Sequence, residues 1–537
     1  MLPTSSQRIK NIVVVGGGTA GWLSAAYLNK ALNRNQSNFC RITLIESNNI
    51  PTVGVGEGTI FTLKETFEFL EIPELEWMVR CNATYKLAIK FVNWSNASRK
   101  DMYWHPFGGI PIVEPFGFPL SHYWLARRNQ GNSEPYGQSC SEHVHLCEAQ
   151  KAPKSQVGEY SPWDLEYAYH LDAGLLASFL KEKSLAAGVN HIIDRVKDVA
   201  LDERGFIDHL ITENHGDLDG DLFIDCSGFR GVLINQSLQE PFVSYNQSLI
   251  CDRAIAISTP YPIDDKFDLK NGGINPYTTS TAMSSGWIWH TPLVSRGGNG
   301  YVYSNAFISD EDAEKELRKH LGIESEKLAA RHLKMRVGKT RNSWVKNCVS
   351  IGLSGGFVEP LEASGIYLIE AGLESLVHHF PDLDFAPSVI ASYNQTINQI
   401  YEEIRDFIVM HYCLSKRDDT AFWQANVHDL IIPDTLKSRL ELWQHKWHSN
   451  PSSLPQPIGR HYPGHSYTCI LEGMNCLPTK SLPILAYQDN SEAEKCFSQL
   501  NKMASILKTD LPNHSNYLEK MHSQYFQLGI KKMLAIN

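Results

Sequence analysis

The start of the chain alternates between short apolar runs and a helical pattern. Residues 10–15 and 41–45 are apolar over the length of one buried β-strand, and residues 22–30 between them place apolar side chains at helical spacing. Two buried strands joined by a helix are the unit from which a parallel sheet with covering helices is built. This part of the chain therefore predicts an α/β fold of the Rossmann type.

The mixed pattern continues for most of the chain and then becomes mainly helical. The remaining predicted strands cover residues 85–94, 205–212 and 220–228. The remaining predicted helices cover residues 62–70, 175–183, 310–321 (with Ser309 as N-cap), 365–379 and 392–410. We therefore predict an α/β core over residues 1–385 and a mainly helical lobe over residues 386–537, packed together as one integrated unit.

The turn after the first predicted strand carries a G-x-G-x-x-G motif. Gly16 permits a tight turn, Gly18 lets the backbone approach a pyrophosphate, and Gly21 allows close packing of helix and strand. The helix that follows offers its positive N-terminal end to the phosphates. Glu46 ends the next strand, where an acidic side chain binds ribose hydroxyls. The motif predicts a dinucleotide site and does not by itself distinguish FAD from NAD.

The segment 220–228 ends in Asp-x-x-Gly at Asp225 and Gly228. In many two-lobed flavoproteins such a strand returns to the cofactor. The alternative is an ordinary core strand followed by a turn, and both interpretations stay open at this point.

Composition and charge exclude several classes of protein. The chain has 537 residues, 42% of them hydrophobic and 20% charged, with 49 basic against 59 acidic side chains. The net charge of −10 argues against a nucleic-acid-binding protein. No signal peptide is evident, and no stretch reaches the roughly 18 apolar residues of a membrane span. The eleven cysteines lack metal-ligand spacing and indicate reduced thiols in a cytoplasmic protein that holds no metal.

Five segments carry a resemblance to a known family. They are residues 16–22, 53–59, 85–94, 287–292 (Trp-x-Trp-x-x-Pro) and 357–367, in this order. With them the chain resembles the flavin-dependent tryptophan halogenases over nearly its full length. The resemblance implies a two-lobed flavoprotein in which reduced FAD and oxygen oxidise chloride or bromide to hypohalous acid. The halogen then passes to an electron-rich aromatic ring such as an indole.

The resemblance also assigns two catalytic residues. It implies that Lys86 holds the hypohalous acid, either by a hydrogen bond or as a haloamine, and that Glu362 stabilises the cationic ring and accepts its proton. Lys90 is the rival of Lys86, because in one continuous strand both side chains point to the same face. Glu359 is expected to be structural.

Further roles are implied in the same way. The FAD-binding residues implied by the resemblance are Gly16, Gly18, Thr19, Ala20, Gly21, Glu46, Val53, Gly54, Gly56 and Leu353. The other implied roles are a halide site at Ser364 and Gly365, an aromatic substrate site at His105 and Phe107, and a wall beside the flavin at Trp287 and Trp289. The implied partners are a separate NAD(P)H-dependent flavin reductase and a second copy of the chain in a dimer.

The sequence departs from the family pattern at two places. The halide segment reads Glu-Ala-Ser-Gly instead of Glu-Ser-Thr-Gly, which leaves the preferred halide open. The segment that holds the amino-acid end of free tryptophan is shortened to residues 459–467, which predicts a more open site for an indole. An FAD-dependent aromatic hydroxylase and a non-catalytic flavin-binding protein are the alternative functions.

Overall fold

The computed structural model describes residues 8–34, 39–48, 56–97, 101–114, 117–158, 165–261, 273–445 and 462–536. The chain forms two compact units, each assembled from three separate stretches of sequence. Unit 1 comprises Met1–Pro73, Asp172–Asn246 and Met335–Glu402, and unit 2 comprises Glu74–Leu171, Gln247–Lys334 and Glu403–Asn537. This division differs from the linear one at residues 385 and 386, because contacts join stretches that are far apart in the chain.

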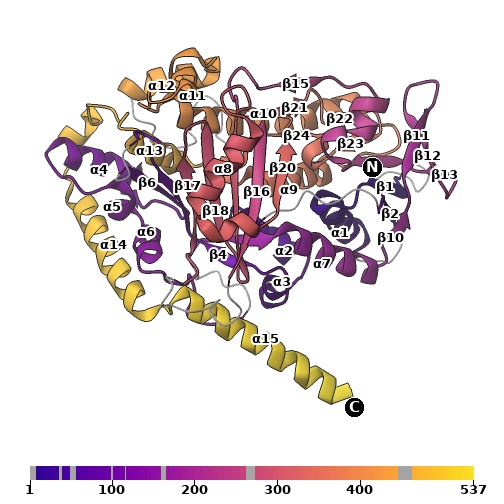
Figure 1. Ribbon diagram of the computed structural model, residues 1–537, viewed down its shortest axis with the longest axis horizontal. Coiled ribbons are helices and arrows are strands. Elements are labelled where there is room, and N and C mark those ends of the chain that lie inside the picture. Colours follow the sequence, from indigo (N-terminus) through magenta and orange to yellow (C-terminus); the bar gives the residue numbers. More distant parts are fainter. Residues whose placement is uncertain are drawn as a thin grey trace. The chain divides into compact units, whose positions relative to one another are not determined.

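Unit 1 is built on a six-stranded sheet. The strand order is β10-β2-β1-β14-β23-β22, and every neighbouring pair is parallel except β22 with β23. The strands are β1 (Asn11–Val15), β2 (Arg41–Glu46), β10 (Asn190–Ile193), β14 (Leu222–Asp225), β22 (Trp344–Val345) and β23 (Cys348–Ser350). Helices α1 (Thr19–Asn33) and α7 (Ala173–Ala186) lie together beside β1 and β2 (Figure 1). The predicted Rossmann-type fold is confirmed.

The core of unit 1 explains why these runs become strands. Val13 and Phe223 are neighbours in parallel register on β1 and β14, and both are fully buried. They pack against Leu210 of a second, three-stranded sheet. That sheet consists of β11 (Val196–Leu201), β12 (Ile207–Thr212) and β13 (Asp217–Asp219). A strand buried on both faces is apolar throughout, which is the pattern that the sequence showed.

Unit 2 is built on a seven-stranded mixed sheet. The strand order is β20-β16-β19-β18-β17-β5-β6, with β17 and β5 as the parallel pair. The strands are β5 (Ala88–Val92), β6 (Met102–Pro106), β16 (Arg253–Pro260), β17 (Tyr277–Ala282), β18 (Gly286–Pro292), β19 (Arg296–Tyr303) and β20 (Ala330–Lys334). Helix α8 (Asp310–Leu321) packs its apolar side on this sheet, and Ser309 caps it as predicted by accepting the N–H of Asp312.

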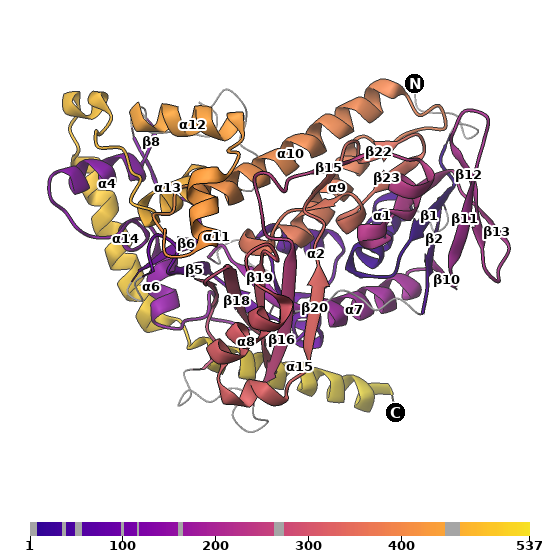
Figure 2. The same ribbon diagram turned by 45° about the horizontal axis from the view of Figure 1, so that its top comes forward.

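The described C-terminal part is mainly helical, as predicted. Helix α10 (Pro387–Cys413) is followed by α11 (Ala421–Gln424), α12 (Asp434–His445), α13 (Gly464–Gly473), α14 (Ser491–Asp510) and α15 (His514–Ile536). In Figure 2 the yellow helix α14 runs along α4 (Leu120–Asn129) and α6 (Glu142–Glu148), which belong to the same unit. Among the described residues, no helix is both long and apolar enough to cross a membrane.

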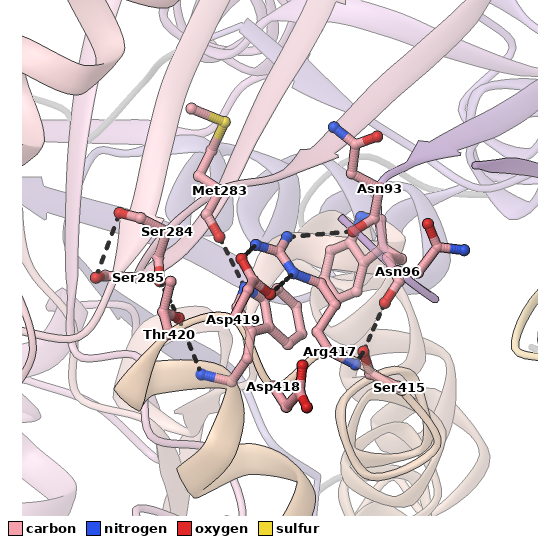
Figure 3. A network of polar contacts seen from close by, with 12 residues as sticks. Asn93, Asn96, Met283, Ser284, Ser285, Ser415, Arg417, Asp418, Asp419 and Thr420 are labelled. Atoms are coloured by element: carbon pink, nitrogen blue, oxygen red, sulfur yellow. Dashed lines mark hydrogen bonds and ion pairs between the residues drawn. The ribbon is translucent and has the colours of Figure 1, made fainter. Parts of the chain in front are cut away.

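A buried arginine fixes the segment between α10 and α11. The Arg417 guanidinium donates two hydrogen bonds of 2.8 Å to the Asp419 carboxylate and one of 3.2 Å to the carbonyl of Asn93, just after β5 (Figure 3). Its face covers the Trp423 ring, 4.5 Å from the ring centroid. Thr420 then donates to the carbonyl of Ser284, in the turn between β17 and β18 (Figure 3). One segment therefore anchors the end of β5 and the entry to β18.

Candidate active site

The predicted dinucleotide cradle lies at the start of α1 in unit 1. Gly18 is the N-cap of this helix, and the first turn has neither a side-chain cap nor an acidic residue. A Cβ atom at Gly18 would meet no atom of the described residues within 4 Å. A Cβ at Gly21 would lie 1.8 Å from the carbonyl oxygen of Gly16. These are the properties that a bound pyrophosphate requires, and the residues present fit FAD.

Glu46 lies at the rim of this cradle. Its carboxylate accepts hydrogen bonds from Lys181 (2.8 Å) and from His191 (2.9 Å), and it lies where a Cβ at Gly17 would be. Two neighbours thus hold the carboxylate at the carboxyl end of β2. This is the place at which a ribose is bound in this type of fold.

The turn that contains Leu353 lies against Ala20, and both residues were predicted to bind the flavin. Leu353 belongs to a turn whose Gly352 has φ of +75°, and a Cβ at Gly352 would lie 2.7 Å from Cβ of Ala20. The turn is tied to β14, because Ser354 donates to the carbonyl of Asp225. The Asp225 carboxylate is itself used internally, since it accepts the N–H groups of Leu233 and Ile234. The structure therefore favours the core-strand interpretation for the Asp225 side chain.

The glycine-rich loop is described from Gly56 onward, where it forms β3 (Gly56–Gly58). The predicted flavin residues Val53 and Gly54 lie outside the described residues. Glu57 lies in this loop and was not among the predicted site residues. Burial, and secondarily the charge of Asp172, raise the pKa of Glu57 to about 7. A titratable carboxyl in a candidate flavin loop indicates a functional site, and the glycine motif alone does not reveal it.

The second predicted anion site is the start of helix α9 (Ser364–His378). Ala363 is its N-cap in the left-handed conformation (φ 57°) and provides no side-chain cap. Among the described residues, the buried Ser364 hydroxyl has no hydrogen-bond partner and a Cβ at Gly365 would meet nothing within 4 Å. Open N–H groups at a helix start bind anions, so Ser364 and Gly365 fit a halide. Glu362 directly precedes this turn and is 2% exposed.

In unit 2, the segment 85–94 is two strands and not the single strand predicted. β4 (Thr84–Lys86) pairs with β9 (Ala168–Asp172), and β5 begins at Ala88 in the seven-stranded sheet. The chain changes partner at Leu87, whose N–H donates to the carbonyl of Pro276. The expectation that Lys86 and Lys90 lie on one continuous strand was therefore wrong.

The two lysines have different surroundings. Lys86 is fully buried, and its amine lies 5.2 Å from the centroid of the Phe107 ring. Lys90 is only partly buried and lies 5.3 Å from the Trp104 ring, its cross-strand neighbour. The structure thus brings together Lys86 and Phe107, which the resemblance placed in one site. The two amines therefore differ in burial, and Lys86 is the one removed from solvent.

A neutral histidine stands next to the strand of Lys86. His170 of β9 lies opposite Thr84, whose hydroxyl donates to the carbonyl of Pro292 (2.6 Å) and must therefore accept from Nδ1 of His170 (2.9 Å). Nε2 of His170 then accepts from the hydroxyl of Thr278 (2.9 Å). Burial and then the charge of Lys86 hold the pKa of His170 well below its usual value. The ring adds no positive charge near the lysine.

His105 lies against the C-terminal helices. Its Nε2 is 2.8 Å from the Ser466 hydroxyl on α13, and its ring contacts Phe407. Phe407 stacks on Tyr462 with 3.9 Å between ring centroids. Residues 459–461 of the shortened segment lie outside the described residues. Tyr462, Ser466 and Phe407 thus pack in one group with His105, which sequence spacing did not reveal.

The two tryptophans of the Trp-x-Trp-x-x-Pro motif lie on one face of β18. Their ring centroids are 6.3 Å apart, and Trp287 is 1% exposed. The Trp289 ring covers Gly300 so closely that a Cβ there would lie 2.0 Å from it. Trp287 also contacts Trp94 at 6.4 Å. The two rings and Trp94 form one packed aromatic group, and a position of Trp287 and Trp289 beside the flavin stays a prediction.

The described residues contain no cluster of histidine, cysteine and acidic side chains that could hold a metal ion. All eleven cysteines are free thiols in the structure.

Comparison with known proteins identifies the family. The family model described as tryptophan halogenase matches residues 11–490. The tryptophan 6-halogenase SttH of Streptomyces toxytricini is 40% identical over 531 residues, which cover 95% of this chain and 98% of that protein. The chain belongs to the tryptophan halogenase family.

Solved structures of halogenases have the same fold. The crystal structure of SttH superposes with a TM-score of 0.87 at 42% identity, covering 95% of this chain and 99% of that one. BrvH, a flavin-dependent halogenase from Brevundimonas sp. BAL3, gives a TM-score of 0.85 at 33% identity, covering 96% and 99%. The predicted resemblance and fold class are confirmed, and the chain is an enzyme of the flavin-dependent halogenase family. Membership gives no support to the non-catalytic alternative.

Proposed function

We propose that this protein oxidises a halide with reduced FAD and oxygen, and that it transfers the halogen to the indole ring of tryptophan or of another indole-bearing molecule. The observation that carries the proposal is the fully buried Lys86 amine over the Phe107 ring. Family membership supports it, since relatives at about 40% identity are named tryptophan 6-halogenases.

Each unit has residues suited to one part of this chemistry. Bound reduced FAD supplies, with oxygen, the two-electron oxidation that turns halide into hypohalous acid. Gly18 and the open end of α1 would hold its pyrophosphate, and Ser364 with the N–H groups starting α9 would hold the halide. The sequence shows no second nucleotide motif for NAD(P)H, so the reduced flavin comes from a separate flavin reductase.

Hypohalous acid is small, so a residue must capture it before it escapes. We assign this role to Lys86, whose amine donates a hydrogen bond to the oxidant and orients its halogen toward the ring. The attacked ring carbon forms a bond to the halogen and loses its proton, and hydroxide leaves the oxidant to form water. Glu362 is the carboxylate that stabilises the cationic ring and takes the proton.

The substrate ring is expected to lie beside His105 and Phe107. Flat aromatic rings pack well against such side chains. The short segment around Tyr462 favours indoles that lack the zwitterionic end of free tryptophan. Free tryptophan remains the second candidate, because the named relatives act on it.

The test is a mass-spectrometric assay with the protein, FAD, a flavin reductase, NADH and oxygen. A panel of tryptophan, other indoles and phenols is run once with chloride and once with bromide. The proposal expects a halogen isotope pattern that follows the halide supplied. Products that gain only one oxygen atom, whatever the halide, would instead establish the aromatic hydroxylase.

Two glycine substitutions in the cradle distinguish an effect on packing from an effect on FAD binding. Gly21→Ala should lower the thermal midpoint and weaken FAD binding, because its Cβ would lie 1.8 Å from a backbone oxygen, a clash worth about 1–3 kcal/mol. Gly18→Ala has open space around the new methyl group and should leave the apoprotein's midpoint unchanged while FAD binding weakens. Calorimetry of the apoprotein and flavin fluorescence titration measure both effects. Wild-type FAD affinity in Gly18→Ala would rule out this cradle.

A further inference from the structure

The strand that carries Lys86 has one edge without a neighbouring strand among the described residues. β4 pairs with β9 alone, with Tyr85 opposite Tyr169 and Lys86 opposite Ala168. N–H groups two residues apart in a strand point the same way, so those of Tyr85 and Leu87 face this other edge. Both residues are fully buried, and a buried N–H without a partner is costly. These two amides lie on either side of Lys86.

The first turn of α15 supplies the partner of the first amide. The Tyr85 N–H donates to Nε2 of His514 (3.2 Å), and Nδ1 of the same ring donates to the carbonyl of Ile274 (2.8 Å). The Leu87 N–H donates to the carbonyl of Pro276 (2.8 Å), two residues further along that segment. One imidazole therefore links β4 to the segment that holds the second amide.

The protonation state of His514 follows from these bonds. One ring nitrogen must accept and the other must donate, so the ring is neutral in a single tautomer. His514 is fully buried, and burial lowers its pKa to about 4. The Ser515 hydroxyl accepts the N–H of Ile274 (2.8 Å). Helix α15 therefore binds both the N–H and the carbonyl of Ile274, as a neighbouring strand would.

We propose that His514 is a positioning residue for Lys86 and that it fixes the backbone from which the lysine amine captures the oxidant. This inference rests on the proposed function. Lys86 is fully buried, so neighbouring atoms restrict the rotation of its side chain. A shift of the backbone therefore moves the amine as well. A misplacement of about 1 Å in a reacting group costs on the order of 10²-fold in rate. A loosened strand would thus release hypohalous acid and leave flavin oxidation unchanged.

Two substitutions separate the two hydrogen bonds of the ring. His514→Gln places an amide oxygen near the position of Nε2 and keeps an acceptor for Tyr85. His514→Asn places an amide nitrogen near the position of Nδ1 and keeps only the donor to Ile274. Ser515→Ala is the matched control, because it loosens the same turn without touching the Tyr85 bond.

The readout is the fraction of flavin turnovers that end in halogenated product, with a chlorination-sensitive dye reporting escaped hypohalous acid. His514→Gln and Ser515→Ala should stay within about threefold of wild type, whereas His514→Asn should fall about tenfold with a matching rise in escaped oxidant. Equal yields for His514→Asn and wild type would overturn the inference. An equal loss in Ser515→Ala would do so too, since the effect would then be general loosening.

A second measurement needs no activity. Hydrogen exchange of the peptide containing the Tyr85 amide should be slow in wild type and His514→Gln and faster in His514→Asn. Exchange that is fast in wild type would overturn the inference even where halogenation is normal. The wild-type enzyme could form neither halogenated product nor trapped oxidant while the three proteins still show this exchange pattern. That result would refute the proposed function and leave the hydrogen bond between His514 and Tyr85 established.

Discussion

Replacing Lys86 with methionine is expected to abolish halogenation while the protein continues to oxidise reduced flavin. Methionine fills a similar volume, so the contact with the Phe107 ring remains and the amine alone is lost. Removing one preorganised donor from a reacting centre costs about 10²–10³-fold, and here the donor is also the group that retains the oxidant. Product is measured by mass spectrometry, flavin oxidation by absorbance, and escaped hypohalous acid by a trapping dye.

Lys90→Met is the matched control. Lys90 also lies over an aromatic ring, at a nearly equal distance, but it is partly exposed on a different strand. We expect it to keep product formation within about threefold of wild type, as is usual for a substitution away from the reacting atoms. If Lys90→Met lost the activity and Lys86→Met kept it, the roles of the two lysines would be exchanged. Thermal unfolding of both variants checks that neither effect comes from misfolding.

The sequence predicted well those elements whose signal is local. The first strand, the glycine turn and α1 follow from apolar runs and glycine positions within about 20 residues. The N-cap of α8 followed from Ser309 and the acidic first turn alone. The proposed cradle at Gly18 and the proposed anion site at Ser364 are backbone features, so a short motif is enough to predict them.

What the sequence did not predict depends on distant partners. The strand ends at Lys86 because Leu87 binds Pro276, and no pattern within residues 85–94 reveals that partner. His105 and Ser466 are 361 residues apart in the chain and 2.8 Å apart in space. The division into two units has the same cause, since each unit is assembled from three stretches. Local periodicity carries no information about such pairings.

A buried carboxylate on α3 (Glu74–Arg80) contacts the same strand through the Tyr85 side chain. Glu74 accepts hydrogen bonds from Lys154 (2.6 Å) and from the hydroxyls of Tyr167 (2.9 Å), Tyr169 (2.8 Å) and Tyr85 (3.3 Å). Glu74 is 1% exposed and Lys154 is 3% exposed. Burial and then the charge of Glu74 raise the pKa of Tyr85 far above its usual range, so this phenol remains a donor. Four donors around one carboxylate satisfy the geometry that a buried ion pair requires.

Glu74→Gln should therefore destabilise the protein by about 3–5 kcal/mol, because it leaves the Lys154 ammonium buried without a counter-charge. The measurement is the free energy of unfolding in urea. The double variant Glu74→Gln/Lys154→Met removes both charges, and it should recover much of the loss, since an apolar side chain in place of a buried ion is often neutral. Glu74→Gln with wild-type stability would show that the ion pair is not enclosed as the structure has it. A double variant less stable than Glu74→Gln would show that Lys154 contributes packing or hydrogen bonds beyond its charge.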